Sequence, residues 1–304
     1  MTTRTWRGGT GNITQARNWS PNGAPQPGDV LNVSNGTVNI SGGQLPASET
    51  LNLAGTATVN LKHVNAAELS ASGTSTVNLN NSAGVKLHNV GQGQITVNAD
   101  GNNQLDVSTP GRDSGSAVTI HNDGLLTGSL NGFTTNYTID GGQFHNVNST
   151  AGYDGQKFTV NADVVGAGVF HLGSFHGPRG TMEFAHSVSA DQTVSMDGGM
   201  WGWTDLQIDD PSAFKASVLW NTPNTGVIDL NGLAADSYSA HDGVLDFFSG
   251  DTLVDTLRFS DPSGYAFAVG QGTSTGAAGV EIYSSGSAMI PHGAALPQHV
   301  AATV

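Results

Sequence analysis

The segment Thr58-Val59-Asn60-Leu61 decides the fold, because close copies of it recur along the first half of the chain. The copies are Thr37-Val38-Asn39-Ile40, Thr76-Val77-Asn78-Leu79, Thr96-Val97-Asn98-Ala99, Thr119-Ile120-His121, Thr138-Ile139-Asp140 and Thr159-Val160-Asn161-Ala162. Their Val or Ile positions follow one another at intervals of 18 to 23 residues, and Met182 is expected to continue the series. Self-similarity at such a period is the signature of a solenoid, in which each repeat forms one rung of a stack.

A second series of apolar residues lies between these copies. Leu51, Leu69, Leu87 and Leu105 follow one another at intervals of 18 residues, and Gly-, Asn- and Ser-rich corners separate the two series. Because strand side chains alternate between faces, Val and Leu are expected to point into a core while Thr and Asn point outward and stack into ladders. The sequence therefore predicts an all-β fold, a right-handed parallel β-helix of seven or eight rungs of about 20 residues. A β-sandwich of short strands is the alternative, but it gives no reason for a fixed 20-residue period.

The composition excludes several classes of protein. The chain has 304 residues, 42 of them Gly, and a formal net charge of −14 with only 10 Lys and Arg. So few cations argue against binding of nucleic acid or of an anionic membrane surface. There is no Cys, so disulfides and thiolate sites are absent, and no apolar run is long enough for a membrane span. No apolar leader follows Met1, so export is expected either without a cleaved N-terminal signal or after a leader that this sequence does not include.

Residues 1–35 differ from the repeats and are predicted to form an N-terminal cap. They contain Trp6 before Gly8, Gly9 and Gly11, then Asn18-Trp19, then Pro25, Pro27, Gly28 and Asp29 ahead of a Val-rich strand. This pattern resembles the opening of autotransporter passenger domains and related bacterial secreted β-helical adhesins. The resemblance covers about 35 residues, and it implies a β-helical fold and a cell-surface location rather than an outer-membrane anchor.

The rest of the chain is predicted to form three further parts. Residues 36–220 form the solenoid, in which the tetrapeptide fades after residue 163 while aromatic residues accumulate. Residues 221–285 form an antiparallel β module, with short strands at 227–230, 243–248, 253–259, 266–269 and 280–283 and turns at Asp242-Gly243 and Ser249-Gly250-Asp251. This module resembles, more weakly, a C-terminal module of secreted α-proteobacterial proteins. Residues 286–304 form a tail that would be disordered unless something such as a neighbouring subunit held it.

The sequence indicates no metal site or cofactor. Among ten His residues, the closest pair, His171 and His176, has a spacing of five that suits neither a strand nor a helix ligand pair. Calcium could be considered only at Asp209-Asp210 and at Asp251 with Asp255, because no calcium-binding loop motif is present.

Enzymatic activity is not expected. Polysaccharide lyases and glycoside hydrolases share the β-helix fold, but they need carboxylates at matching rung positions. Asp140 and Asp163 occupy different positions. The basic residues that fall in predicted corners with no acidic companion are Lys62, Lys86, Arg112, Lys157 and Arg179. Trp201 and Trp203 could stack on a sugar ring, although capping or a protein interface explains them better.

The outward ladders offer a contact surface for a partner. Its candidate residues are Thr37, Thr58, Thr76, Thr96, Asn39, Asn60, Asn78 and Asn98, together with Trp201 and Trp203. Such ladders suit ice binding if the rungs form a regular lattice, but they also stabilise the stack itself. We therefore expect a non-enzymatic, secreted structural or adhesive protein of the bacterial cell surface that associates with itself into filaments or matrix, or with a surface polysaccharide. Polysaccharide binding or degradation, and ice binding, are the alternatives.

Overall fold

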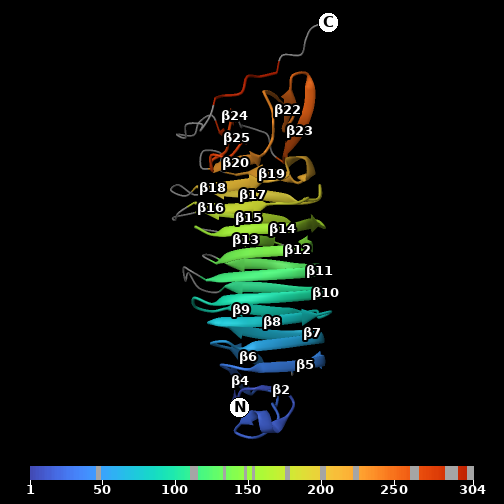
Figure 1. Ribbon diagram of the computed structural model, residues 1–304, viewed down its shortest axis with the longest axis vertical. Helices are drawn as coiled ribbons and strands as arrows, with labels where there is room; N and C mark the ends of the chain where they lie inside the picture. Colours follow the sequence, from blue (N-terminus) through green and yellow to red (C-terminus); the bar gives the residue numbers. More distant parts are fainter. Residues whose placement is uncertain are drawn as a thin grey trace. The chain divides into compact units, whose positions relative to one another are not determined.

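The regular secondary structure of the described residues consists almost entirely of strands (Figure 1). The computed structural model describes residues 1–45, 49–109, 116–132, 135–146, 149–152, 155–174, 179–198, 203–221, 226–260, 267–284 and 294–299. These residues contain two short 3-10 turns and no α-helix. They form a β-solenoid of about eight turns with rungs of about 21 residues, plus extra antiparallel strands, which confirms the predicted fold class. The chain divides into two compact units, residues 1–145 and 146–304.

The strands of the first unit are short at the N-terminus and longer further on. They are β1 (Thr3–Trp6), β2 (Thr10–Asn12), β3 (Trp19–Ser20), β4 (Val30–Val33), β5 (Thr37–Gln44), β6 (Thr50–Leu53), β7 (Thr58–Ala71), β8 (Thr74–Asn80), β9 (Val85–Asn89), β10 (Gln94–Thr109), β11 (Ala117–Gly132) and β12 (Asn136–Asn146), with the 3-10 turn η1 (Ala16–Asn18) before β3.

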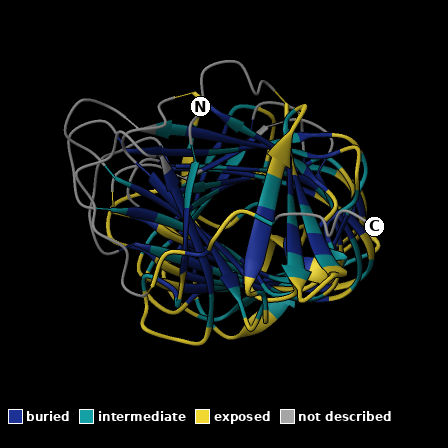
Figure 2. Cartoon of the chain, turned by 90° about the horizontal axis from the view of Figure 1, so that it is seen from above, coloured by how far each residue is buried: buried dark blue, intermediate teal, exposed yellow. Residues whose placement is uncertain are grey.

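The repeated tetrapeptide stacks in register through the first unit, as predicted. Val38 pairs with Val59, Val59 with Val77, Val77 with Val97 and Val97 with Ile120, all in parallel strands. These five side chains are fully buried. In Figure 2, buried stretches of strand lie inside and exposed residues gather at the periphery and in the corners. The period-2 alternation of the strands thus separates an apolar core from outward polar columns.

The second apolar series departs from the prediction at its last member. Leu51 pairs with Leu69 and Leu69 with Leu87, but Leu87 pairs with Val107, while Leu105 pairs with Val85. Leu105 is fully buried even so, because a shift of two residues leaves every side chain on its own face. Equal sequence spacing therefore identified an inward residue but not its partner.

The N-terminal segment, which the sequence predicts to be a cap, contributes strands that pair with the strands after it. β1 pairs with β4 and β2 with β5, both in parallel. Trp6 and Trp19 are buried edge to face with ring centroids 5.1 Å apart, and Trp19 Nε1 donates to the carbonyl of Ile13 at 2.7 Å. Asp29 accepts from Arg4 Nε at 2.5 Å, a hydrogen bond that lowers the pKa of this carboxyl group. The Trp, Asn-Trp and Gly-Asp residues of the sequence pattern thus make contacts that hold the N-terminal segment together.

The second unit begins with more rungs and ends in antiparallel strands. Its elements are β13 (Ser149–Gly152), β14 (Lys157–Val165), β15 (Val169–Ser174), β16 (Gly180–Phe184), β17 (Thr193–Gly198), β18 (Thr204–Ile208), η2 (Pro211–Ala213), β19 (Ser217–Trp220), β20 (Gly226–Asn231), β21 (Ser237–His241), β22 (Val244–Ser249), β23 (Thr252–Phe259), β24 (Phe267–Gln271) and β25 (Gly279–Ser284).

The register of these rungs corrects a second expectation. Val160 pairs with Phe184, and Met182, which the repeat predicted at that place, pairs with Phe158. Phe184 packs edge to face against Phe170 with ring centroids 5.0 Å apart. Both Met182 and Phe184 are fully buried. The shift is again two residues. The prediction that Met182 faces inward is therefore confirmed, while its predicted pairing partner was wrong.

The C-terminal strands pair as antiparallel hairpins, as predicted. The turn at Asp242 and Gly243, with φ of 45° and 77°, connects β21 to β22, and a second two-residue turn connects β22 to β23. β21 was not anticipated from the sequence. β20 has two partners, β18 in parallel and β25 in antiparallel, so the module continues the sheet of the last rungs.

Part of the predicted tail is held by its own unit. The backbone of residues 294–299 bonds to β21 and β24: Leu296 N donates to Val269 O at 2.8 Å, and Tyr238 N donates to Pro297 O at 3.1 Å. Leu296 is buried, and the ring of His299 stacks on Phe248 at 4.0 Å. These six residues therefore pair with strands of their own unit.

Candidate functional site

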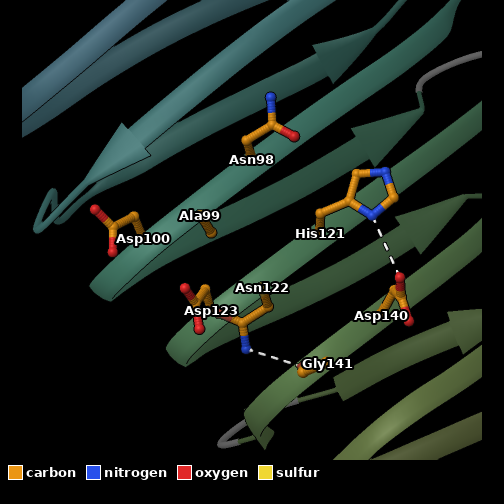
Figure 3. Close-up of a pocket in the computed structure, with 8 residues that line it drawn as sticks. All are labelled: Asn98, Ala99, Asp100, His121, Asn122, Asp123, Asp140 and Gly141. Atoms are coloured by element: carbon orange, nitrogen blue, oxygen red, sulfur yellow. Dashed lines mark hydrogen bonds and ion pairs between the residues drawn. The ribbon is translucent and has the colours of Figure 1, made fainter.

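A shallow groove crosses successive rungs of the first unit. It consists of two adjoining hollows of about 420 and 320 Å³ that share Asn98 and Asp100. The smaller hollow lies over β7, β8 and β10, and the larger one over β10, β11 and β12. Figure 3 shows the larger hollow, where polar side chains from neighbouring strands lie in rows over the sheet. The groove thus follows the outward columns of the repeat.

One of those columns is a ladder of Asn side chains. Asn60 Nδ2 donates to Asn39 Oδ1 at 2.7 Å, Asn78 Nδ2 to Asn60 Oδ1 at 2.6 Å, and Asn98 Nδ2 to Asn78 Oδ1 at 2.6 Å. Every donor lies one rung after its acceptor. Because one Nδ2 hydrogen and one Oδ1 lone pair of a bonded amide remain, the ladder both joins the rungs and leaves groups for a ligand.

The Asn column turns acidic towards β12. On the next rung, His121 takes the place that Asn98 has in the column, and its Nδ1 lies 3.4 Å from Asp140 Oδ2. In the next outward column Asp100 and Asp123 pair in register, and Asp100 accepts a hydrogen bond from Asn80 Nδ2 at 2.6 Å. Both aspartates are exposed. Because like charges on adjacent strands repel, this arrangement is tolerable only where water or a counter-charge screens it.

The wall of the larger hollow contains Asn122, a buried polar side chain. Asn122 is 5% exposed, and its Nδ2 donates to Gly124 O, Gly141 O and Gln143 O at 3.0 to 3.3 Å. Its Oδ1 has no hydrogen-bond partner among the residues that the structure describes. An unpaired buried carbonyl costs free energy, because it has given up its hydrogen bonds to water.

The residues predicted as a contact surface divide between the two units. Thr37, Thr58, Thr76 and Thr96 form one half-buried column beside the Asn ladder, in register. The structure therefore brings the eight Thr and Asn residues together on one face. Trp203 is half-buried in the second unit, where its carbonyl accepts from Gly180 N at 2.9 Å, and Trp201 lies outside the described residues.

The second unit contains a carboxylate cluster that sequence reasoning missed. Asp205 on β18, Asp229 on β20 and Glu281 on β25 are buried, and Asp229 pairs in register with Glu281. Burial raises the pKa of Asp205 to about 6, although Arg179 acts in the opposite direction; the charge of Asp229 raises it further. Ser274 contacts Asp229, to which it donates through both its backbone N–H and its hydroxyl group.

Two cations of the second unit contradict the sequence prediction. Lys157 Nζ lies 2.8 Å from Glu183 Oε2 and Arg179 Nε lies 3.3 Å from Asp205 Oδ2, so both have the acidic companion that the sequence was expected to lack. Glu183, Gln207 and Asp229 form one column, at intervals of 24 and 22 residues. These intervals exceed the 20-residue period, and for that reason the column was not found from the sequence.

Three further candidates from the sequence analysis, Asp209, Asp210 and His171, contact other side chains or the backbone of their own unit. Asp210 caps η2 by accepting from Ala213 N, and Asp209 accepts from Asn231 Nδ2 at 2.6 Å. His171 lies 3.5 Å from Asp197, and His176 lies outside the described part of the chain. Within that part, no three His, Asp or Glu side chains gather in a way that could hold a metal ion.

Comparisons with protein-family models, with curated proteins and with solved structures gave no match to this chain. The described residues include no helix that is long and apolar enough to cross a membrane.

Proposed function

We propose that this protein is a non-enzymatic structural or adhesive β-solenoid of the bacterial cell surface, which binds a surface or matrix polysaccharide through the groove of its first unit. The observation that carries the proposal is the Asn ladder, which joins four rungs by side-chain bonds and faces an open polar groove. Hydroxyl-rich polymers are recognised by such rows of amides, because each amide offers a donor and an acceptor.

The N-terminal cap adds support to an extracellular location. Its Trp, Asn-Trp and Pro-Gly-Asp pattern, which resembles that of bacterial secreted β-helical adhesins, is built around the Trp6–Trp19 pair and the Arg4–Asp29 ion pair. The low fraction of charged residues, 11%, also suits a stack of repeated rungs, because like charges on adjacent rungs would repel.

The polysaccharide part of the proposal is tested with purified protein and a panel of immobilised polysaccharides. Replacing Asn98 by Tyr fills the point that the two hollows share, so we expect it to abolish binding. Asn102→Tyr, at an exposed position of the same strand, is the matched control and should bind like the wild type. If the wild type binds no polysaccharide, or if both variants bind equally, this part is wrong.

The structural part of the proposal includes self-association into filaments. Electron micrographs of the purified chain are expected to show rods or bundles, and bacteria that lack the protein are expected to lose attachment or matrix. Monodisperse single particles under all conditions would contradict filament formation, and unchanged attachment would contradict the adhesive role.

The carboxylate pair of the second unit favours polysaccharide degradation as a second candidate function. Glycoside hydrolysis uses one protonated and one ionised carboxyl group, and Asp205, whose pKa is raised, adjoins Asp229 beneath Ser274. Release of reducing ends from a polysaccharide panel, lost in Asp205→Asn and kept in the exposed control Asp191→Asn, would support this function. No release by the wild type would exclude it.

A further inference from the structure

We infer that the groove of the first unit selects a polysaccharide that carries free amino groups. This inference rests on the proposed function and adds the chemical class of the ligand. Three features of the groove lead to it: its carboxylates, its amides and the unpaired carbonyl in its wall.

The carboxylates give the larger hollow a negative charge. Asp100, Asp123 and Asp140 come from three successive rungs, and His121 is the basic side chain among the residues that line this hollow. Asp123 has no hydrogen bond or ion pair within the described chain, and the other two keep exposed surface. An ammonium group between two rungs could approach Asp100 and Asp123 together and remove the repulsion between them.

The amides extend the groove in the other direction, where Asp100, at the end shared with the larger hollow, is the carboxylate among the lining residues. Asn60, Asn78 and Asn98 line the smaller hollow, with Lys62 at its far end. Along the five rungs of the groove, the lining residues therefore change from amides with Lys62 at one end to carboxylates at the other end. A polymer that has hydroxyl groups throughout and amino groups on some units matches this gradient, whereas a polyuronate would meet like charge at Asp100, Asp123 and Asp140.

The wall of the larger hollow supplies the observation that points to a bound donor. Asn122 is 95% buried, it belongs to the hollow, and its Oδ1 lacks a partner among the described residues. Figure 3 shows Asn122 held towards Gly141 through its nitrogen, beside Asp123. A hydroxyl or ammonium hydrogen that reached this oxygen would satisfy it.

The spacing of the rungs suits a polymer better than a small cation. Successive strands lie about 4.8 Å apart, which is close to the advance of one hexose unit along an extended chain. A sugar chain lying across the strands can therefore present one unit to each rung. A basic peptide would bring its own amide groups and a different repeat, so it serves as the competing ligand in the test.

The test measures binding of a glucosamine hexamer and of an N-acetylglucosamine hexamer by isothermal titration calorimetry. We expect the glucosamine hexamer to bind about tenfold more tightly, and the difference to shrink as salt is raised, because exposed charges are screened. The variant Asp123→Asn should reduce glucosamine affinity about threefold, and Asp100→Asn with Asp123→Asn about tenfold, since exposed ion pairs contribute modestly. The control is Glu68→Gln, an exposed carboxylate of the first unit that lines neither hollow.

The outcomes separate this inference from the proposed function. Equal affinity for the two hexamers, or an unchanged double variant, would overturn the amino-group selectivity while leaving polysaccharide binding intact. Lysine hexamer bound as tightly as glucosamine hexamer would overturn recognition of a sugar. Binding of no polysaccharide at all would overturn both. Asp123→Asn keeps the inference testable if the double variant fails to fold, because the Asp123 side chain makes no hydrogen bond or ion pair within the described chain.

Discussion

Asn98 and Asn78 are joined by a side-chain hydrogen bond of 2.6 Å, although 20 residues separate them in the sequence. The bond links two rungs outside the backbone ladder. Asn78 also donates to Asn60, which donates to Asn39. Asn78 is therefore an inner member of a chain of four amides and makes two of its hydrogen bonds.

Replacing Asn78 by Ala is expected to lower the free energy of unfolding of the first unit by about 1–2 kcal/mol, because two hydrogen bonds are lost. Asn102→Ala, an exposed Asn in the same unit, should change it by less than about 0.5 kcal/mol. Urea denaturation followed by circular dichroism measures both. Equal midpoints for the two variants would show that the ladder does not stabilise the stack.

Two glycines provide a matched test of how tightly the rungs pack. Gly36 and Gly42 both have positive φ, of 81° and 65°, but a Cβ on Gly36 would lie 2.5 Å from Gly9 O, whereas a Cβ on Gly42 would meet nothing within 4 Å. Gly42→Ala should therefore destabilise by about 1 kcal/mol, and Gly36→Ala by about 3 kcal/mol, because overpacking is added to the backbone cost. Thermal unfolding of both variants measures the difference, and similar losses would argue against a close contact between Gly36 and Gly9.

Glu49 makes the first unit sensitive to pH. Its carboxyl group is buried without a hydrogen-bond partner among the described residues, and burial, assisted by the charge of Asp29, raises its pKa from 4.5 to about 7. A pKa raised by folding means that the stabilising contribution is complete below the unfolded value and is lost as pH rises through about 7.

Glu49→Gln should remove that part of the pH dependence and make the protein more stable than the wild type above about pH 7, while Glu68→Gln, at an exposed site, should not. Melting temperatures across this range measure the effect. A wild-type profile that is flat, or that rises with pH in step with Glu49→Gln, would rule out burial of the Glu49 charge.

The C-terminal residues should stabilise the second unit. Ending the chain after residue 293 removes the buried Leu296 and the His299–Phe248 stack, so we expect a loss of about 2–3 kcal/mol. Ending it after residue 299 keeps these contacts and should have a much smaller effect. Denaturation of the two truncated chains makes the comparison, and equal stabilities would mean that the pairing with β21 and β24 contributes little.

Much of the fold could be predicted from the sequence, because alternation and period are local properties. Val38, Val59 and Val77 repeat both the residue type and the spacing, so their face and their partners were correct. Leu105 and Met182 show the limit, because corners of variable length moved each of them by two residues without changing its face.

The candidate sites depend on that register and were less predictable. The Asn ladder followed from the repeat, but the groove needed the pairing of Asp100 with Asp123, which lie 23 residues apart. The cluster of Asp205, Asp229 and Glu281 was not found, because β25 joins β20 in antiparallel fashion from a hairpin, and no repeat relates it to the rungs.

The uniform direction of the Asn ladder has an electrostatic consequence. Asn60, Asn78 and Asn98 each donate towards the N-terminal side and Asn39 accepts the last bond, so the side-chain dipoles of the row are aligned and add, as peptide dipoles do along a helix. The positive end of this row is Nδ2 of Asn39, and the negative end is Oδ1 of Asn98, where the carboxylates begin. The row of uncharged amides thus produces an electric field along the stack. A positively charged ligand would be attracted to the Asn98 end of the row and repelled from the Asn39 end.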